Sequence, residues 1–220
     1  MLPDSIHPVR SPFLIIKDLV KGLSVKTTFF GAIFLLIASV GDGMNGAILP
    51  IMYMQNLGWE PDTYSQVTGG LGTLLEFCGA LVGGFLADRM GRRRIIIAGY
   101  GGFGLMALIF GMCSVYWQIT WFSSGYLIIY PFFRAMGAVA IFALFMHISW
   151  TKSAATMFTC YMAISNISST IGNTLAGNIT EKIPIEMSFI LIGFLAVIPL
   201  VVLIWMDADE MSDIKLKDST

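Results

Sequence analysis

The chain has 220 residues, of which 56% are hydrophobic and only 12% are charged. An average soluble domain carries about 25% charged residues, so half of the usual charge is missing. The formal net charge of −1 also lacks the basic surplus of a nucleic-acid-binding protein. A soluble globule of this composition would expose far too much apolar surface, and a disordered chain would be far more polar. The composition therefore indicates an integral membrane protein and argues against a soluble enzyme.

Six apolar stretches are each long enough to cross a bilayer, which takes about 20 residues. We expect spans over residues 27–54 (ending near Pro50), 63–87, 94–113, 118–149, 153–179 and 184–206. The fourth stretch is long enough to require tilt or an overhanging end. The predicted fold is thus an all-α integral membrane bundle of six transmembrane helices over residues 27–206. Residues 1–26 precede it, and an acidic tail follows over residues 207–220.

The positions of the basic residues predict the orientation of the bundle, because cytoplasmic loops are enriched in Lys and Arg. In a six-span arrangement eleven of the thirteen fall on one side, with only Lys182 opposite and Arg134 inside the membrane. Both termini are therefore expected to be cytoplasmic. Within the N-terminal segment, residues 13–23 are amphipathic and too short and charged to span, so we expect a helix on the inner membrane surface.

The sharpest motif runs over residues 84–94, between the second and third spans. Gly84 allows a neighbouring helix to approach closely, and Gly91 can adopt a left-handed turn conformation. Asp88 offers an acceptor at the membrane edge, where cationic side chains or a helix N-terminus would stabilise it. A simpler interpretation treats the arginines as topological anchors, but it does not account for the spacing of the other motif residues.

This spacing resembles the signature loop of the major facilitator superfamily, matched at Gly84, Leu86, Ala87, Asp88, Arg89, Gly91, Arg92 and Arg93. In that superfamily the loop follows the second helix of each six-helix half and latches the cytoplasmic side. The resemblance covers nearly all of residues 27–206 and implies an inverted 3+3 repeat, one half of a twelve-helix fold. It also places Asp88 against the start of the fifth span, near Ser153, when the cytoplasmic side is closed.

A finer resemblance is to the second half of the muropeptide-permease and acetyl-CoA-transporter branch. It rests on Gly41-Asp42, Leu57-Gly58-Trp59, residues 79–84 and Met136-Gly137, among others. The chain departs from that branch by having Tyr130 where a glutamate often stands and Arg134 where a glycine does. We therefore do not assign the substrates of that branch to this chain.

Four polar residues on four different spans are expected near the middle of the membrane: Asp42, Glu76, Arg134 and Asn166. With a helix rise of about 1.5 Å per residue, each lies roughly 18–24 Å from the inner end of its span. Ionisable groups at that depth are costly and mark substrate or ion sites in transporters built from repeats. Alternatively, the arginine and one carboxylate form a structural ion pair, the other carboxylate is left without a partner, and Asn166 forms a hydrogen bond between helices.

The resemblance implies a secondary active transporter, or half of one, that moves a small solute by alternating access with proton or ion coupling. Asp42 and Glu76 would carry the coupling ion, and Arg134 would bind an anion or switch charge. The competing hypotheses are a non-transporting membrane scaffold or assembly partner, and an inactive fragment. The expected partners are the lipid bilayer, a small-molecule substrate, and an N-terminal six-helix half or a second copy. We expect that these 220 residues alone do not transport.

No catalytic residue, cofactor or metal site is expected, and nucleic acid is not an expected partner. The chain has no Walker loop for ATP hydrolysis. Cys78, Cys113 and Cys160 show no metal-ligand spacing and are interpreted as small packing residues.

Overall fold

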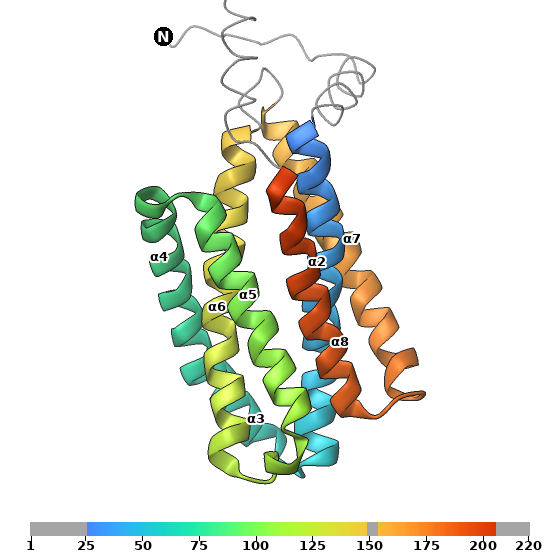
Figure 1. Ribbon diagram of the computed structural model, residues 1–220. Coiled ribbons are helices and arrows are strands. Elements are labelled where there is room, and N and C mark those ends of the chain that lie inside the picture. Colours follow the sequence, from blue (N-terminus) through green and yellow to red (C-terminus); the bar gives the residue numbers. More distant parts are fainter. Residues whose placement is uncertain (1–25, 149–153, 206–220) are drawn as a thin grey trace, which may run out of the picture.

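The computed structural model describes residues 26–148 and 154–205, which form a bundle of long helices (Figure 1). The elements in chain order are α2 (Lys26–Pro50), η1 (Ile51–Asn56), α3 (Pro61–Val67), η2 (Thr68–Gly72), α4 (Thr73–Met90), α5 (Arg92–Met112), η3 (Ser114–Tyr116), α6 (Thr120–Ile148), α7 (Ala154–Thr180), α8 (Ile185–Val197) and η4 (Ile198–Trp205). Because η1, η2 and η4 continue neighbouring α-helices, the described residues contain six long helical stretches. Each coincides with a predicted span to within three residues at either end.

The first helical stretch does not end near Pro50, so that part of the prediction is wrong. Pro50 lies inside the helix, and the chain continues through the π-helical segment Ile51–Asn56. A proline removes one helical hydrogen bond, and the wider π turns that follow let the chain continue as a helix. A second π-helical segment, Thr68–Gly72, joins α3 to α4 and is rich in glycine.

Five helices of the described chain are long and apolar enough to cross a membrane: Thr28–Asn56, Pro61–Met90, Arg92–Met112, Thr120–Met146 and Ile185–Ile204. Helix α7 has 27 residues, which is also long enough, but it is not one of the five. Asn166, Asn173 and Asn178, together with several Ser and Thr residues, lower its hydropathy. Its crossing of the membrane therefore stays a prediction.

Glycines bring several pairs of helices into close contact, among them α2 with α7 and α4 with α6. A Cβ atom at Gly43 would overlap the backbone of Ser169, and one at Gly79 would overlap the backbone of Phe132. Gly83 contacts α6 in the same way, at Met136. Such close backbone approach is typical of helix packing in membranes.

The helices fall into two groups, α2 with α7 and α8, and α4 with α5 and α6 (Figure 1). We call two of the contacts between these groups the α5–α8 seam and the α2–α6 seam. The α5–α8 seam is tight: a Cβ atom at Gly104 would lie 2.6 Å from Val197 Cγ2 and 2.9 Å from the carbonyl oxygen of Gly193. Across the α2–α6 seam few residues of the two helices are in contact.

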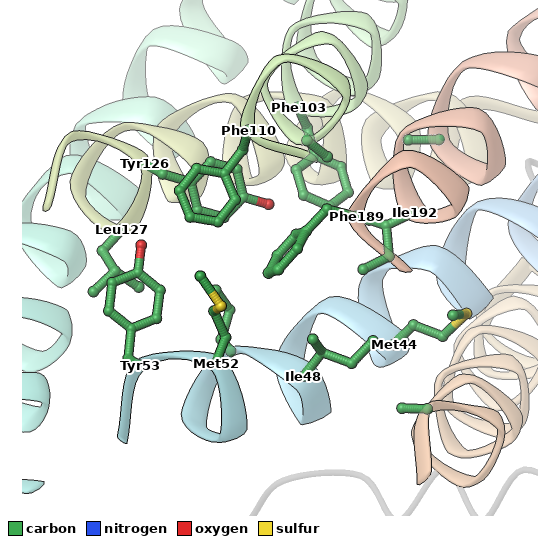
Figure 2. Packing of buried hydrophobic residues seen from close by; sticks show 14 of the residues in the cluster. Met44, Ile48, Met52, Tyr53, Phe103, Phe110, Tyr126, Leu127, Phe189 and Ile192 are labelled. Atoms are coloured by element: carbon green, nitrogen blue, oxygen red, sulfur yellow. The ribbon is translucent and has the colours of Figure 1, made fainter. Parts of the chain in front are cut away.

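The apolar core consists of two clusters, one toward each end of the bundle. One cluster includes Phe34, Ile96 and Phe145. The other is built around Phe110, whose ring stacks on Tyr126 with 4.3 Å between centroids (Figure 2). Trp117 joins this second cluster, is only 8% exposed and donates from Nε1 to the Phe110 carbonyl at 2.8 Å.

The start of α2, the α4–α5 turn and the end of η4 lie at the same end of the bundle (Figure 1). The arginines of that turn therefore share an end with both termini of the helical bundle, as an even number of spans requires. The predicted surface helix over residues 13–23 and the tail over residues 207–220 lie outside the described residues.

Candidate functional site

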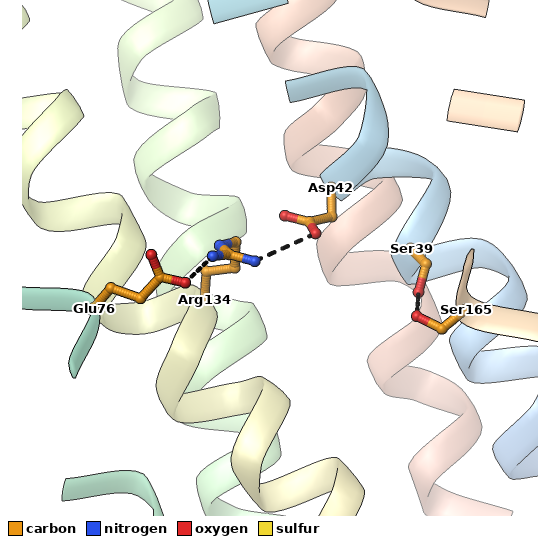
Figure 3. Close-up of polar contacts among 5 residues, drawn as sticks. All are labelled: Ser39, Asp42, Glu76, Arg134 and Ser165. Atoms are coloured by element: carbon orange, nitrogen blue, oxygen red, sulfur yellow. Dashed lines mark hydrogen bonds and ion pairs between the residues drawn. The ribbon is translucent and has the colours of Figure 1, made fainter. Parts of the chain in front are cut away.

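Three ionisable side chains from three helices come together within the bundle (Figure 3). Arg134 on α6 lies between Glu76 on α4 and Asp42 on α2. Its Nη2 atom forms a hydrogen-bonded ion pair with Glu76 Oε1, and its Nη1 atom lies 3.6 Å from Asp42 Oδ2. The three side chains are 30–42% exposed, so they line an opening rather than the closed core. We refer to them as the charge triad.

The packing of α2 explains why Asp42 reaches toward α6. Asp42 stands between two glycines, each of which packs against a different helix. A Cβ atom at Gly41 would lie 3.1 Å from Leu195 Cβ on α8, and Gly43 contacts the backbone of Ser169 on α7. Because two faces of α2 pack closely on α7 and α8, the face that bears Asp42 is directed toward α6. The Asp42 carboxylate therefore reaches Arg134 across the α2–α6 seam.

A polar cleft of about 570 Å³ opens at this seam, between α2, α6 and α7. Two members of the charge triad, Asp42 and Arg134, line it together with Asn45, Tyr130, Ser169 and Asn173. Small residues of α2, Gly43, Gly46 and Ala47, form the rest of its wall and leave room for a solute. A concave site with a few convergent polar groups is the usual form of a small-molecule site.

The charge balance of the triad limits what the cleft can do. Two carboxylates face one guanidinium, so the fully ionised triad carries one negative charge. Arg134 is shared between both carboxylates and offers no uncompensated positive charge to an anion. One carboxylate can instead take up a proton, which leaves a neutral pair. Among the described residues, no group of three His, Cys, Asp or Glu side chains could hold a metal ion.

The structure brings together three of the four residues expected at the middle of the membrane. The fourth, Asn166, is exposed on α7 and does not line the cleft. Ser169 and Asn173, which follow it at i+3 and i+7 on the same side of the helix, line the cleft instead. Asn45 and Tyr130 were not among the site residues predicted from the sequence. Their spacing could have predicted them, because Asn45 lies one helical turn from Asp42 and Tyr130 lies one helical turn from Arg134.

The predicted latch motif forms the tight α4–α5 turn. Gly91 has φ +91°, as expected, and its N–H donates to the Ala87 carbonyl at 3.1 Å. Asp88 is exposed, and the Arg89 guanidinium lies 4.2 Å from the centre of the Phe85 ring. Arg92 is half-buried and Arg93 is exposed. Ser153, the expected partner of Asp88, lies outside the described residues.

One expectation for this motif is wrong: Gly84 is not a point of close helix approach. A Cβ atom there would lie 3.7 Å from Val139 Cγ1, which is an ordinary van der Waals contact. The close approach of α4 to α6 occurs at Gly83, the residue before it, and at Gly79, five residues before it. The motif spacing therefore located the turn correctly but not the glycines that the helix packing needs.

A bundle of apolar helices around a polar cleft defines a membrane protein of the transport class. The family model of the Major Facilitator Superfamily matches residues 31–219, so the chain belongs to that superfamily of membrane transporters. Its members are in general transporters rather than enzymes. The match is to the superfamily as a whole, and the muropeptide-permease and acetyl-CoA-transporter branch stays a prediction. Comparisons with curated proteins and with solved structures gave no match.

Proposed function

We propose that the chain is one six-helix half of a secondary active transporter that moves a small solute by alternating access. The observation that carries this proposal is the charge triad, to which three helices contribute ionisable groups and of which Asp42 and Arg134 line the polar cleft. A charged side chain inside a spanning helix costs at least ~2.5–3.5 kcal/mol on insertion scales, so three such groups are rarely kept without a role.

The geometry of the triad supports coupling to protons. Asp42 is the member that reaches across the α2–α6 seam, and it is held less closely by Arg134 than Glu76 is. A proton on Asp42 removes the ion pair across the seam and leaves the Arg134–Glu76 pair neutral. The same proton therefore changes both the charge of the cleft and the attraction between the two helix groups.

The packing of the helices supports the inverted 3+3 repeat that the superfamily resemblance implies. If α2, α4 and α5 form the first repeat, then α6, α7 and α8 form the second. The first helix of each repeat packs closely on the second helix of the other, α2 on α7 and α6 on α4. The two third helices, α5 and α8, pack on each other. Two repeats related by a pseudo-two-fold axis in the membrane plane would make this symmetric set of contacts.

The exposed polar side of α7 supports the proposal of a partner bundle. Asn166, Thr170, Asn173 and Thr174 are all exposed on this helix. Polar groups at membrane depth are tolerated where they face protein or a water-filled cavity. We therefore propose that a second six-helix bundle, covalently linked or separate, or else a second copy of this chain, completes the cavity. We also propose that both termini are cytoplasmic, because the basic residues gather at that end.

Uptake into membrane vesicles from cells of the native host, which supply the partner bundle, tests this proposal. With an imposed pH gradient and a panel of labelled amino acids, sugars and nucleosides, we expect at least one solute to accumulate. Asp42→Asn should abolish gradient-driven accumulation and retain exchange of that solute. Asp62→Asn removes an exposed carboxylate outside the triad and is the matched control. No accumulation of any solute would favour the scaffold hypothesis. Full accumulation with Asp42→Asn would contradict proton coupling through Asp42.

Reconstitution of the purified chain alone tests the need for a partner. We expect liposomes that contain only this chain as a monomer to take up no solute, because half of the cavity wall is missing. Uptake by a demonstrable monomer would contradict the partner proposal and leave the coupling proposal intact.

A further inference from the structure

Asn45 carries an unsatisfied hydrogen-bonding group at the wall of the cleft. The residue is only 1% exposed, and within the described chain no atom accepts a hydrogen bond from its Nδ2 atom. Buried side-chain amides are nearly always satisfied, since leaving a buried donor unpaired costs roughly 1–3 kcal/mol. An unsatisfied amide beside a polar cleft therefore calls for an explanation.

The other end of the same amide is held in place. Tyr126 on α6 donates its hydroxyl hydrogen to Asn45 Oδ1 at 2.8 Å, across the α2–α6 seam. The Tyr126 ring is fixed in turn by stacking on Phe110 and on Tyr130, with centroids 4.3 and 5.2 Å apart. Asn45 is thus oriented by a packed aromatic group, which leaves its N–H hydrogens as the free hydrogen-bonding capacity of the side chain.

The neighbours of Asn45 in the cleft define the chemistry of an occupant. Asp42 lies one helical turn away on the same side of α2, and Gly46 beside it has no atom within 4 Å of where a Cβ would be. Tyr130 brings an aromatic side chain to the α6 side of the cleft. Because Glu76 beside the cleft already pairs with Arg134, the ionised triad has one net negative charge, which disfavours an anion in the cleft relative to a neutral or cationic group.

We propose that Asn45 is a solute-binding residue whose amide N–H donates a hydrogen bond to an oxygen acceptor of a solute without net negative charge. This inference rests on the proposed transport function and names the solute class of the same cleft. A site that presents an unsatisfied donor discriminates strongly against analogues that lack the acceptor, because the donor then stays unpaired. Asn45 would therefore determine specificity rather than coupling.

Equilibrium binding to the purified full chain in lipid nanodiscs tests this role with four probes of similar shape. The labelled probe is L-phenylalaninamide, which has an ammonium group, a carbonyl acceptor and an aromatic ring. The competitors are phenethylamine, which lacks the carbonyl, zwitterionic L-phenylalanine, and anionic L-phenyllactate. We expect phenethylamine to compete at least about tenfold more weakly than unlabelled L-phenylalaninamide, the effect of one hydrogen bond of about 1.4 kcal/mol. L-Phenyllactate should compete least.

Two variants separate a binding role from a structural one. Asn45→Leu should bring phenethylamine and L-phenylalaninamide to the same affinity. Ser39→Ala removes another hydrogen bond of α2, the 2.9 Å contact with Ser165, away from the cleft (Figure 3). It should keep the tenfold difference. An unchanged difference in Asn45→Leu, preferential binding of L-phenyllactate, or no binding of L-phenylalaninamide would overturn the inference. Because nanodiscs have no gradient, these outcomes are independent of the uptake assay that tests the transport proposal.

Discussion

The two seams between the helix groups are built in opposite ways. At the α5–α8 seam, Gly104 and Gly193 let the two backbones touch, and apolar side chains fill the remaining space. At the α2–α6 seam fewer residues are in contact, and three polar links join the two helical stretches: Tyr53 to the Ser123 carbonyl, Tyr126 to Asn45, and Arg134 to Asp42. Close apolar packing resists displacement, because any shift opens a void or forces an overlap. Polar links can be broken and re-formed with protons, water or a solute.

This difference assigns separate tasks to the two seams. The α5–α8 seam keeps the two helix groups together, and the α2–α6 seam holds the cleft and the charges. Variants in the apolar seam should therefore lower stability, whereas variants in the polar seam should change binding and coupling. The predictions below test this division, starting with the largest expected effect.

Arg134→Gln should be the most damaging single substitution, since it leaves Asp42 and Glu76 facing each other without a cation. The free energy of unfolding should fall by about 3 kcal/mol, the lower end for breaking a buried pair, because the triad is about one-third exposed. Denaturation of the purified chain in mild detergent measures this change. Adding Asp42→Asn to Arg134→Gln should recover part of the loss. Wild-type stability of Arg134→Gln would show that the triad contributes nothing to holding the helices.

Adding one methyl group should separate the two seams by stability alone. At Gly104 the new Cβ would lie 2.6 Å from Val197 Cγ2, so Gly104→Ala should lower the free energy of unfolding by about 2 kcal/mol. At Gly46 no atom lies within 4 Å of the new Cβ, so Gly46→Ala should leave stability unchanged or raise it by up to ~1 kcal/mol through helix propensity. Equal losses in the two variants would contradict the contrast between the seams.

Tyr53→Phe should have a smaller effect, because it removes one hydrogen bond and keeps the aromatic packing. Tyr53 donates to the Ser123 carbonyl at 2.7 Å within the aromatic cluster. The loss should be about 1 kcal/mol, the usual net value of such a bond. A thermal melt of the purified chain measures it against wild type. No change would mean that another group satisfies the Ser123 carbonyl, and a loss above that for Gly104→Ala would reverse the proposed ranking of the seams.

Much of the fold could be predicted from the sequence because membrane spans follow from length and hydropathy. The turn at Gly91 could also be predicted, since a glycine between two apolar stretches and beside arginines favours a tight turn. It is harder to predict which glycines bring helices into close contact. Gly79, Gly83 and Gly84 look alike in sequence, and only the first two face α6 closely.

The site was partly predictable for a similar reason. Charges at membrane depth stand out in an apolar sequence, so Asp42, Glu76 and Arg134 were identified, but how Arg134 is shared depends on helix rotation. Asn45 and Asn173 were not predicted as cleft residues, because an asparagine in a membrane span has many possible hydrogen-bond partners. Only the structure shows that Asn45 is held by Tyr126 at one end and left unsatisfied at the other.

The central claim is that the polar cleft at the α2–α6 seam is reached alternately from the two sides of the membrane, while the α5–α8 seam stays closed. Two-sided thiol labelling tests it without knowledge of the substrate. In a background with Cys78, Cys113 and Cys160 replaced by Ala, Gly46→Cys reports on the cleft and Ala107→Cys reports on the buried core of α5. Vesicles receive a membrane-impermeant maleimide either outside or trapped inside. We predict that the maleimide labels Gly46→Cys from both sides of the membrane and labels Ala107→Cys from neither side. Labelling of Gly46→Cys from one side only, or from neither side, would contradict the account.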